Sequence, residues 1–331
     1  MELGFDNMRK AICAVAFMPL FASCYSDINF ESQMPDTLPV INAVATPDTV
    51  VMASVSRTYD ASEELTGVQL RDAAVSLFVN GKLHGQMIPK IFDVDIPVGS
   101  TGTSDELRKN KVVYVSDYVP SPHDRIAIEA HTDYGNARVE DIVPEAVAID
   151  DAKVEYTAIS TDWGSVEYHI DYKIRFQDNP VQKNYYFLTV GAVDDWDVGM
   201  VFIDYVDPVF EMQNQDMAET IAGDGALENS WGMTFDDTLI NGMDYEMTVK
   251  EEVQFLTEGV SVLREIKLYS VSEDYYKYLR SVLKDKSRED SALGDLGFYE
   301  PVEIFSNVKG GVGILGAQCC ARRLVEICRQ E

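Results

Sequence analysis

The residues best suited to binding a metal ion are three carboxylates gathered around one tryptophan. Asp194, Asp195 and Asp197 flank Trp196, and Ca²⁺ prefers clustered carboxylate and carbonyl oxygens. Their spacing does not follow the calcium loop of helix–loop–helix proteins. The alternative is a solvated acidic loop, which is expected in a chain with 56 Asp and Glu residues. We predict no metal ion and no cofactor, with these three carboxylates as the candidate site if a cation binds.

Side chains suited to catalysis are present, but they show no recognisable spacing. No Gly-x-Ser-x-Gly elbow marks a serine nucleophile, and the four histidines lack metal-ligand spacing. Catalytic groups can assemble in space, so a hydrolase of surface glycans or peptides that uses carboxylates such as Asp195 and Asp236 is the alternative. A glycosidase needs two carboxylates roughly 5–9 Å apart, whereas an apolar, aromatic cleft favours binding. We predict no catalytic residues and a protein that is not an enzyme.

Three glycines near the C-terminus spell the pattern of a dinucleotide-binding loop. Gly311, Gly313 and Gly316 match Gly-x-Gly-x-x-Gly, but that motif requires a helix, a second parallel strand and an acidic residue about 20 positions on. Only 331 − 316 = 15 residues follow the last glycine. We therefore predict that these glycines allow a backbone angle closed to other residues, or a close contact with another backbone.

The N-terminal segment has the pattern of a secretory signal that ends in a modified cysteine. Arg9 and Lys10 precede an apolar run over residues 11–21, and Ala22 and Ser23 lead to Cys24. The run is shorter than the roughly 20 apolar residues that span a bilayer. The ending resembles a bacterial lipobox, so we predict that residues 1–23 are removed and that Cys24 carries a lipid. Residues 24–37 are then the lipidated cysteine and a polar tether.

The remaining cysteines do not form a disulfide scaffold. Cys319, Cys320 and Cys328 cluster at the C-terminus, whereas a scaffold needs paired cysteines spread along the chain. Cys328 could pair with Cys319 or Cys320 across a bend, or the cysteines could be small buried hydrophobic residues with one exposed thiol. The sequence leaves their redox state open.

Composition restricts the partners of the chain. The formal net charge is -29 over 331 residues, which repels nucleic acid and anionic head groups at long range. Apart from the N-terminal segment, no stretch is apolar and long enough to cross a membrane. After removal of the signal, 331 − 23 = 308 residues remain, which fits two domains of ordinary size.

Short strands dominate the first of these domains, which we place at residues 38–146. Several apolar runs with turn signals between them predict an immunoglobulin-like β-sandwich. Asn80-Gly81, between two apolar runs, is the strongest hairpin signal.

The second domain, residues 147–331, is predicted to be another antiparallel β domain, either a sandwich or barrel-like. Residues 166–176 alternate apolar and polar side chains, as a half-buried strand does. Asn241-Gly242 predicts a second hairpin, residues 207–230 a long loop, and residues 301–308 a strand. One amphipathic helix is predicted over 272–285, with Ser272 as its N-cap. The fold class is therefore mainly β.

A set of motifs spread over the mature chain resembles a known family. The opening LPVINAVATPD, the segment Asp72 to Phe78, and the closing GFYEPVEIFSNVKGGVGILGA occur in the order found in domain of unknown function 4249, a family of Bacteroidota lipoproteins. The resemblance covers about Leu38 to Ala317, and the cysteine-containing tail departs from it. It implies a lipid-anchored protein of the outer membrane, often encoded beside TonB-dependent transporters, and supplies no catalytic residues.

Two main functions follow as hypotheses, and a structural, fimbria-like subunit is a distant third. The first is a non-enzymatic binding protein or accessory subunit of a TonB-dependent transporter, attached to the outer membrane through Cys24 and facing the periplasm or the cell surface. The second is the carboxylate hydrolase described above. The sequence identifies neither the ligand nor the oligomeric state.

Overall fold

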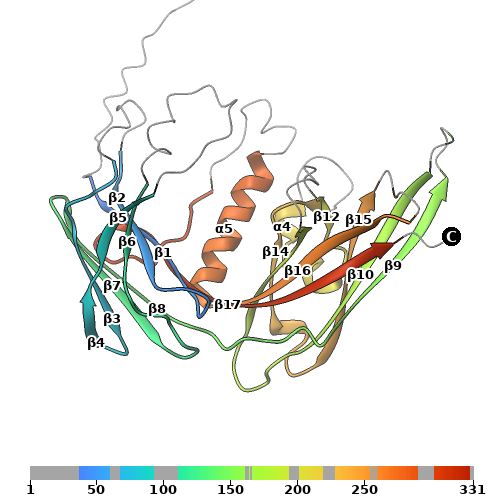
Figure 1. The fold of residues 1–331 in the computed structure, drawn as a ribbon, viewed down its shortest axis with the longest axis horizontal. Coiled ribbons are helices and arrows are strands. Elements are labelled where there is room, and N and C mark those ends of the chain that lie inside the picture. The colour runs from blue at the N-terminus through green and yellow to red at the C-terminus, as the bar shows by residue number, and fades with distance from the viewer. Residues whose placement is uncertain are drawn as a thin grey trace, which may run out of the picture. The chain divides into compact units, whose positions relative to one another are not determined.

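Strands dominate the computed structural model, as the sequence predicts, and they form open sheets of eight, five and four strands (Figure 1). The structure describes residues 37–59, 68–92, 111–160, 164, 166–193, 201–218, 228–253, 256, 259–289 and 302–328. The predicted signal, Cys24 and most of the tether lie outside these ranges. None of the helices within them is long and apolar enough to cross a membrane.

The first eight strands form two layers around one aliphatic core, and we call this region the N-terminal sandwich. One layer is the part of the eight-stranded sheet with the strand order β1-β2-β6-β5. The other layer is the four-stranded sheet, with the order β4-β3-β7-β8. Alternate side chains from both layers are buried against each other, as in a β-sandwich. The strands are β1 (Pro39–Ala45), β2 (Met52–Arg57), β3 (Ala74–Val79), β4 (Lys82–Gln86), β5 (Ile88–Phe92), β6 (Lys111–Val115), β7 (Arg125–Thr132) and β8 (Gly135–Ile142).

The hairpin predicted at Asn80-Gly81 is confirmed. It joins β3 to β4, and the φ angles of Asn80 and Gly81 are 52° and 77°. Two positive φ angles in a two-residue loop give the backbone twist that antiparallel strands need.

The later strands enclose a second core, and we call this region the C-terminal sandwich. One layer is the five-stranded sheet β13-β12-β15-β10-β9, and the other is the part β14-β11-β16-β17 of the eight-stranded sheet. The predicted alternation along β10 is confirmed, since Tyr168, Ile170, Tyr172, Ile174 and Phe176 are all buried. The strands are β9 (Asp151–Ser160), β10 (Val166–Gln177), β11 (Tyr185–Ala192), β12 (Ile203–Asp204), β13 (Glu228–Asn229), β14 (Met233–Asp236), β15 (Asp244–Val253), β16 (Ser261–Val271) and β17 (Val312–Cys328).

The last strand belongs to both sandwiches. The first part of β17 pairs in parallel with β1, from Val40 opposite Val312 to Ala45 opposite Ala317, and the rest pairs antiparallel with β16. Figure 1 shows β17 passing from the side of β1 toward the C-terminal sandwich. The eight-stranded sheet therefore forms one layer of each sandwich.

Gly313 and Gly316 of the sequence pattern lie on β17, and Gly311 directly precedes it. The predicted contact with another backbone is confirmed at Gly311, where a Cβ atom would lie 2.3 Å from the carbonyl oxygen of Pro39, and at Gly313, whereas Gly316 meets a side chain instead. Gly313 has a φ of 113°, and a Cβ atom there would lie 2.2 Å from the carbonyl oxygen of Ile41. A Cβ atom at Gly316 would lie 2.2 Å from the ring of Tyr275. Both positions therefore need a residue without a side chain.

The predicted helix is α5 (Glu273–Glu289), which continues beyond the expected end at residue 285. Ser272 caps it, because its Oγ accepts a hydrogen bond from the Tyr275 N–H at 3.3 Å. Lys286 and Arg288 in the last turn favour the longer helix, since cations stabilise a helix C-terminus.

The second predicted hairpin is wrong. β14 pairs with β11 and β15 pairs with β10, so Asn241-Gly242 connects two sheets. A 3-10 helix, η2 (Asp237–Leu239), follows β14, and the Gly242 N–H donates to Asp178 Oδ2 at 2.8 Å. The turn is held by a side chain from another loop rather than by the opposite strand.

Other segments also differ from the predictions. Residues 302–308 form no strand; instead, the Asn307 side chain bonds both backbone groups of Leu315, at 3.1 and 3.0 Å, in place of a strand partner. The predicted loop 207–230 contains short helices, α3 (Pro208–Glu211), which Asp207 caps, and α4 (Gln215–Ala218).

Candidate functional site

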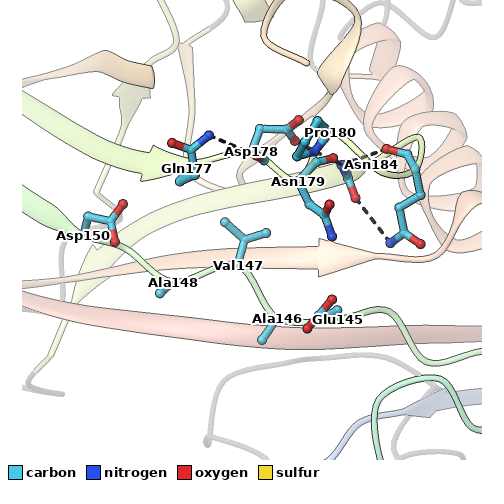
Figure 2. Close-up of a pocket in the computed structure, with 11 residues that line it drawn as sticks. Glu145, Ala146, Val147, Ala148, Asp150, Gln177, Asp178, Asn179, Pro180 and Asn184 are labelled. Carbon is cyan, nitrogen blue, oxygen red and sulfur yellow. Dashed lines mark hydrogen bonds between the residues drawn. The ribbon is translucent and has the colours of Figure 1, made fainter. Parts of the chain in front are cut away.

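A pocket of about 350 Å³ opens where the segment between β8 and β9 passes the loop between β10 and β11 (Figure 2). Its walls come from two short stretches of chain that are about 30 residues apart in sequence. The lining residues are Glu145, Ala146, Val147, Ala148, Asp150, Gln177, Asp178, Asn179, Pro180, Gln182 and Asn184.

The first wall is fastened to the C-terminal sandwich by backbone contacts. The Val147 N–H donates to Ser270 Oγ at 3.1 Å, and the Asp150 N–H donates to the carbonyl of Arg175 at 2.8 Å. Val147 and Ile149 are partly buried against the same core. This segment is therefore held in place although it belongs to no sheet.

The second wall is organised around the buried carboxylate of Asp178. Its Oδ1 accepts hydrogen bonds from the Tyr186 hydroxyl at 2.5 Å and from Asn184 Nδ2 at 3.2 Å, and its Oδ2 accepts the Gly242 N–H. Burial, and then the hydrogen bond to Asp178, raise the pKa of Tyr186. A carboxylate with three donors is satisfied without water, so it fixes this part of the wall.

Asn184 extends this network into the loop. Its Nδ2 donates to the carbonyls of Asn179 at 2.6 Å and Gln182 at 3.0 Å, and its backbone N–H donates to Asp237 Oδ2 at 2.7 Å. The nearby ammonium of Lys183 is 2.6 Å from Asp237 Oδ1. The one cation in this loop is therefore paired outside the pocket, and the loop geometry is determined by buried polar contacts.

The lining offers oxygen atoms and amides but no cationic side chain. It contains three carboxylates, on Glu145, Asp150 and Asp178, together with four side-chain amides, and it has neither Lys nor Arg nor an aromatic ring. Glu145 and Asp150 are exposed, so their carboxylates are open to a ligand. Such a lining can accept and donate hydrogen bonds and attract positive charge, whereas it disfavours an anion.

The sequence-predicted site residues do not gather at this pocket. Cys24 and the calcium candidates Asp194, Asp195 and Asp197 lie outside the described residues. Among the residues that the structure describes, no group of three or more His, Cys, Asp or Glu side chains could hold a metal ion.

Asp236, named for the hydrolase alternative, caps η2 through a hydrogen bond of 2.8 Å from the Thr238 N–H, and it pairs with Lys183 at 3.0 Å. Partial burial would raise the pKa of Asp236, but hydrogen bonds from Thr238 and Lys183 outweigh it and hold that pKa below its usual value. A general acid requires the opposite shift.

The histidines and cysteines are also dispersed. His84 contacts Asp117 at 2.7 Å and His131 contacts Asn136 at 2.9 Å, both on the N-terminal sandwich. None of the described cysteines forms a disulfide. The Cys319 thiol lies 3.1 Å from the carbonyl of Pro144, and burial raises its pKa to about 11. A thiol of that pKa is a weak nucleophile near neutral pH.

A second pocket, of about 330 Å³, lies beside the start of α5. Asp141 of β8 accepts a hydrogen bond from the Ser272 hydroxyl, and Ser272 Oγ in turn accepts the Ala317 N–H at 3.3 Å. Burial raises the pKa of Asp141 to about 7 against the opposing effect of the Ser272 hydrogen bond, and Asp274 adds to the rise. This contact joins β8, α5 and β17.

Neither pocket could be located from the sequence. Asp141 and Ser272 are 131 positions apart, and Asp178 contacts Gly242 across 64. The only local signal was the turn chemistry of Asn241-Gly242, which we interpreted as a hairpin.

Comparisons with known proteins give a family and little beyond it. No curated protein matches the chain. A solved structure of Escherichia coli alpha-2-macroglobulin activated by porcine elastase aligns with 88% of this chain and 22% of that one, at 10% identity and a TM-score of 0.18. The chain thus spans about a fifth of that protein, and a likeness this low carries no argument. The sequence model of one family matches residues 26–321, and by that match the chain belongs to DUF4249, a domain of unknown function.

Proposed function

We propose that this chain is a non-enzymatic lipoprotein that binds a neutral or cationic polar ligand as an accessory to a TonB-dependent transporter of the outer membrane. The observation that carries the binding role is the pocket of about 350 Å³ whose lining has three carboxylates, four amides and no cation. Its walls are held by hydrogen bonds that need no ligand. A preorganised polar site binds without the cost of ordering its own side chains.

The chemistry of the lining narrows the ligand class. Amides and carboxylates form hydrogen bonds with hydroxyl groups, as in a sugar, and carboxylates pair with ammonium groups. The net charge of -29 adds to the repulsion of anions. Neutral oligosaccharides and polyamines are therefore the two chemical classes to test.

The proposed attachment to the outer membrane is supported by the sequence pattern that ends at Cys24. A lipid on that residue, with the 37 − 24 = 13 residues of polar chain that follow, keeps the folded part near the membrane, because an extended chain reaches at most about 3.3–3.6 Å per residue. Tethering raises the effective concentration at a partner in the same membrane to the millimolar range, so weak contacts suffice. Cys24→Ala should abolish labelling by a tagged fatty acid and, in a wash of high ionic strength, release the folded protein into the soluble fraction.

The binding role is tested by titration calorimetry with a panel of neutral oligosaccharides and polyamines. The double variant Glu145→Lys and Asp150→Lys should weaken binding of the active probe at least tenfold, because it places two cations at the pocket. Glu155→Lys, an exposed carboxylate on β9, is the matched control and should bind as the unmodified protein does. Equal affinity in both variants would place the site elsewhere.

The transporter role is tested by cross-linking in intact cells. A large β-barrel should be captured with the lipoprotein after the outer membrane is solubilised in detergent. Repeated capture of no transporter, together with cleavage of a glycan or peptide polymer by the purified protein, would favour the hydrolase instead.

A further inference from the structure

Two sheet edges lie next to each other on the N-terminal sandwich. β4 is the last strand of the four-stranded sheet and β5 is the last strand of the eight-stranded sheet. Only Met87, which is buried, separates them in the chain. Because one residue joins the strands that carry the two edges, both edges lie on the same side of the sandwich.

This side exposes large apolar side chains. Leu83 on β4 is 60% exposed, and Ile88, Ile91 and Phe92 on β5 are 64%, 57% and 44% exposed. Every residue of β5 is exposed, on both faces of the strand. Large apolar side chains exposed one after another along a sheet edge indicate contact with a partner or a membrane. We call Lys82, Leu83, Ile88, Lys90, Ile91 and Phe92 the β4–β5 edge.

The backbone of these strands is poorly suited to adding another strand. Pro89 lies in the middle of β5 and has no N–H to donate. The pairing of β4 with β3 shifts register between Leu77 and Phe78, which bends the other edge. Proline, bulges and lysines are the features by which natural edges resist strand addition. The partner of this edge is therefore contacted by side chains.

The charge of the β4–β5 edge is opposite to that of the chain. Residues 73–92 contain no Asp or Glu, although the chain has 56. Lys82 and Lys90 are exposed there, and the exposed Lys111 of β6 lies opposite Phe92. Asp117 contacts this region through His84. Exposed lysines interleaved with Leu, Ile and Phe form a surface that suits an anionic layer with an apolar interior.

We propose that the β4–β5 edge is a contact site for an anionic lipid surface. Leu83, Ile88, Ile91 and Phe92 enter the boundary between head groups and acyl chains, while Lys82 and Lys90 pair with lipid phosphates. Binding of this kind grows with buried apolar area and with attraction to anionic lipid. The repulsion from the net charge of -29 acts at long range, and salt at physiological strength screens it beyond about 8 Å. The site requires neither the lipid on Cys24 nor the ligand pocket.

The test uses the chain from residue 24 onward with Cys24→Ala, so that no acyl chain contributes. Its sedimentation with vesicles of equimolar phosphatidylglycerol and phosphatidylcholine is compared with sedimentation on phosphatidylcholine alone. We expect binding to the anionic vesicles that weakens with added salt. The double variant Lys82→Gln and Lys90→Gln should lower the partition coefficient by about fivefold for each lysine. Ile88→Ser with Ile91→Ser should lower it further.

The matched control is Lys153→Gln with Val181→Ser, two exposed positions on the C-terminal sandwich, and it should sediment as the parent does. Absence of binding to either vesicle, or equal loss in the control, would overturn the proposal. Self-association or capture of an acidic protein that depends on the same residues, without vesicle binding, would assign the edge to a protein partner instead.

A second measurement covers the case in which the shortened chain fails to fold. The intact chain is mixed with vesicles that contain a photoactivatable lipid, and the residues that form covalent adducts with this lipid are mapped by mass spectrometry. Adducts at residues 82–92, and not at residues 177–184, are expected. The reverse pattern, or adducts confined to the N-terminal segment, would contradict the proposal.

Discussion

The two sandwiches of this molecule are similar in architecture but have different interiors. The buried core of the N-terminal sandwich is aliphatic apart from Tyr114, and its one buried polar side chain among the described residues is Ser76. The core of the C-terminal sandwich combines aliphatic side chains with buried aromatic ones, and Phe176, Tyr186 and Phe235 are in mutual ring contact at centroid distances of 5.0–6.2 Å.

The C-terminal core also holds buried charged groups. Glu251 and Arg264 pair at 2.8 Å inside it, and Asp178, Asp207 and Asp237 are buried at its margin. Aliphatic packing is non-directional, whereas each buried charge requires particular partners. The difference indicates that the C-terminal sandwich specifies a definite geometry, and the pocket wall around Asp178 is part of that geometry.

The largest effect should follow from breaking the buried ion pair. Glu251→Ala leaves the Arg264 guanidinium buried without its carboxylate and removes the acceptor of the Tyr172 hydroxyl. We expect the free energy of unfolding to fall by about 3–5 kcal/mol, measured by denaturant titration. The exposed pair Lys173 and Glu155 is the control, and Glu155→Ala should change stability little. Similar losses in both variants would contradict the contrast between the cores.

A smaller loss of stability is expected from a substitution on β17, the strand that joins the two sandwiches. Gly316→Val would place side-chain atoms within the ring of Tyr275, where a Cβ atom alone would lie 2.2 Å from Cδ2. We expect a loss of about 1–3 kcal/mol in the free energy of unfolding, because either α5 or β17 must shift. The control is Gly85→Ala, because a Cβ atom at Gly85 would meet open space. Gly81 is unsuitable as a control position because its φ angle is positive.

The contact between Asp141 and Ser272 should make stability depend on pH. The native pKa of Asp141 is about 7 against an ordinary value of 3.8. Between these values the native state keeps a proton that the unfolded chain has released, so the stability contributed by Asp141 is full below about pH 4 and is lost as pH rises through 7. The free energy of unfolding should fall by at most about 1.4 kcal/mol per pH unit. Solvent screening makes the fall smaller, because Asp141 is only half-buried.

Asp141→Asn should flatten that slope, so the melting temperature of the variant relative to the parent should rise from pH 5 to pH 8. The charged groups around Asp141 are Arg125, Arg138, Glu140, Asp274 and Lys309. Asp133→Asn, at an exposed turn, is the control. A parallel pH dependence of the Asp141 variant and the parent would show that Asp141 is ionised throughout.

The smallest effect tests whether the two cores differ in apolar packing as well. Ile128→Val in the N-terminal sandwich and Ile266→Val in the C-terminal sandwich each remove one methylene from a fully buried side chain. Both should lower the free energy of unfolding by about 0.5–1.5 kcal/mol in denaturant titrations. A much larger loss at Ile266 would mean that the C-terminal core is less tolerant of volume changes than the N-terminal one.

Local features of the chain were predictable because their physical causes are local. The alternation along β10 follows from residues two positions apart, and the turn at Asn80-Gly81 follows from the φ angles that Asn and Gly adopt. Ser272 was identified as a cap from its place before an acidic first turn. The same reasoning failed at Asn241-Gly242, where a distant carboxylate, Asp178, holds the turn.

By itself, the sequence determined the strand content, the helix near the C-terminus, the special role of the late glycines and the acidic charge. Only the tertiary structure decided that β17 pairs with β1, that Glu251 meets Arg264, and that Asp141 meets Ser272. Periodicity shows which face of a strand is buried, but it does not show which strand lies beside it. Those pairings depend on the packing of the whole chain, and they determine where both pockets and the β4–β5 edge form.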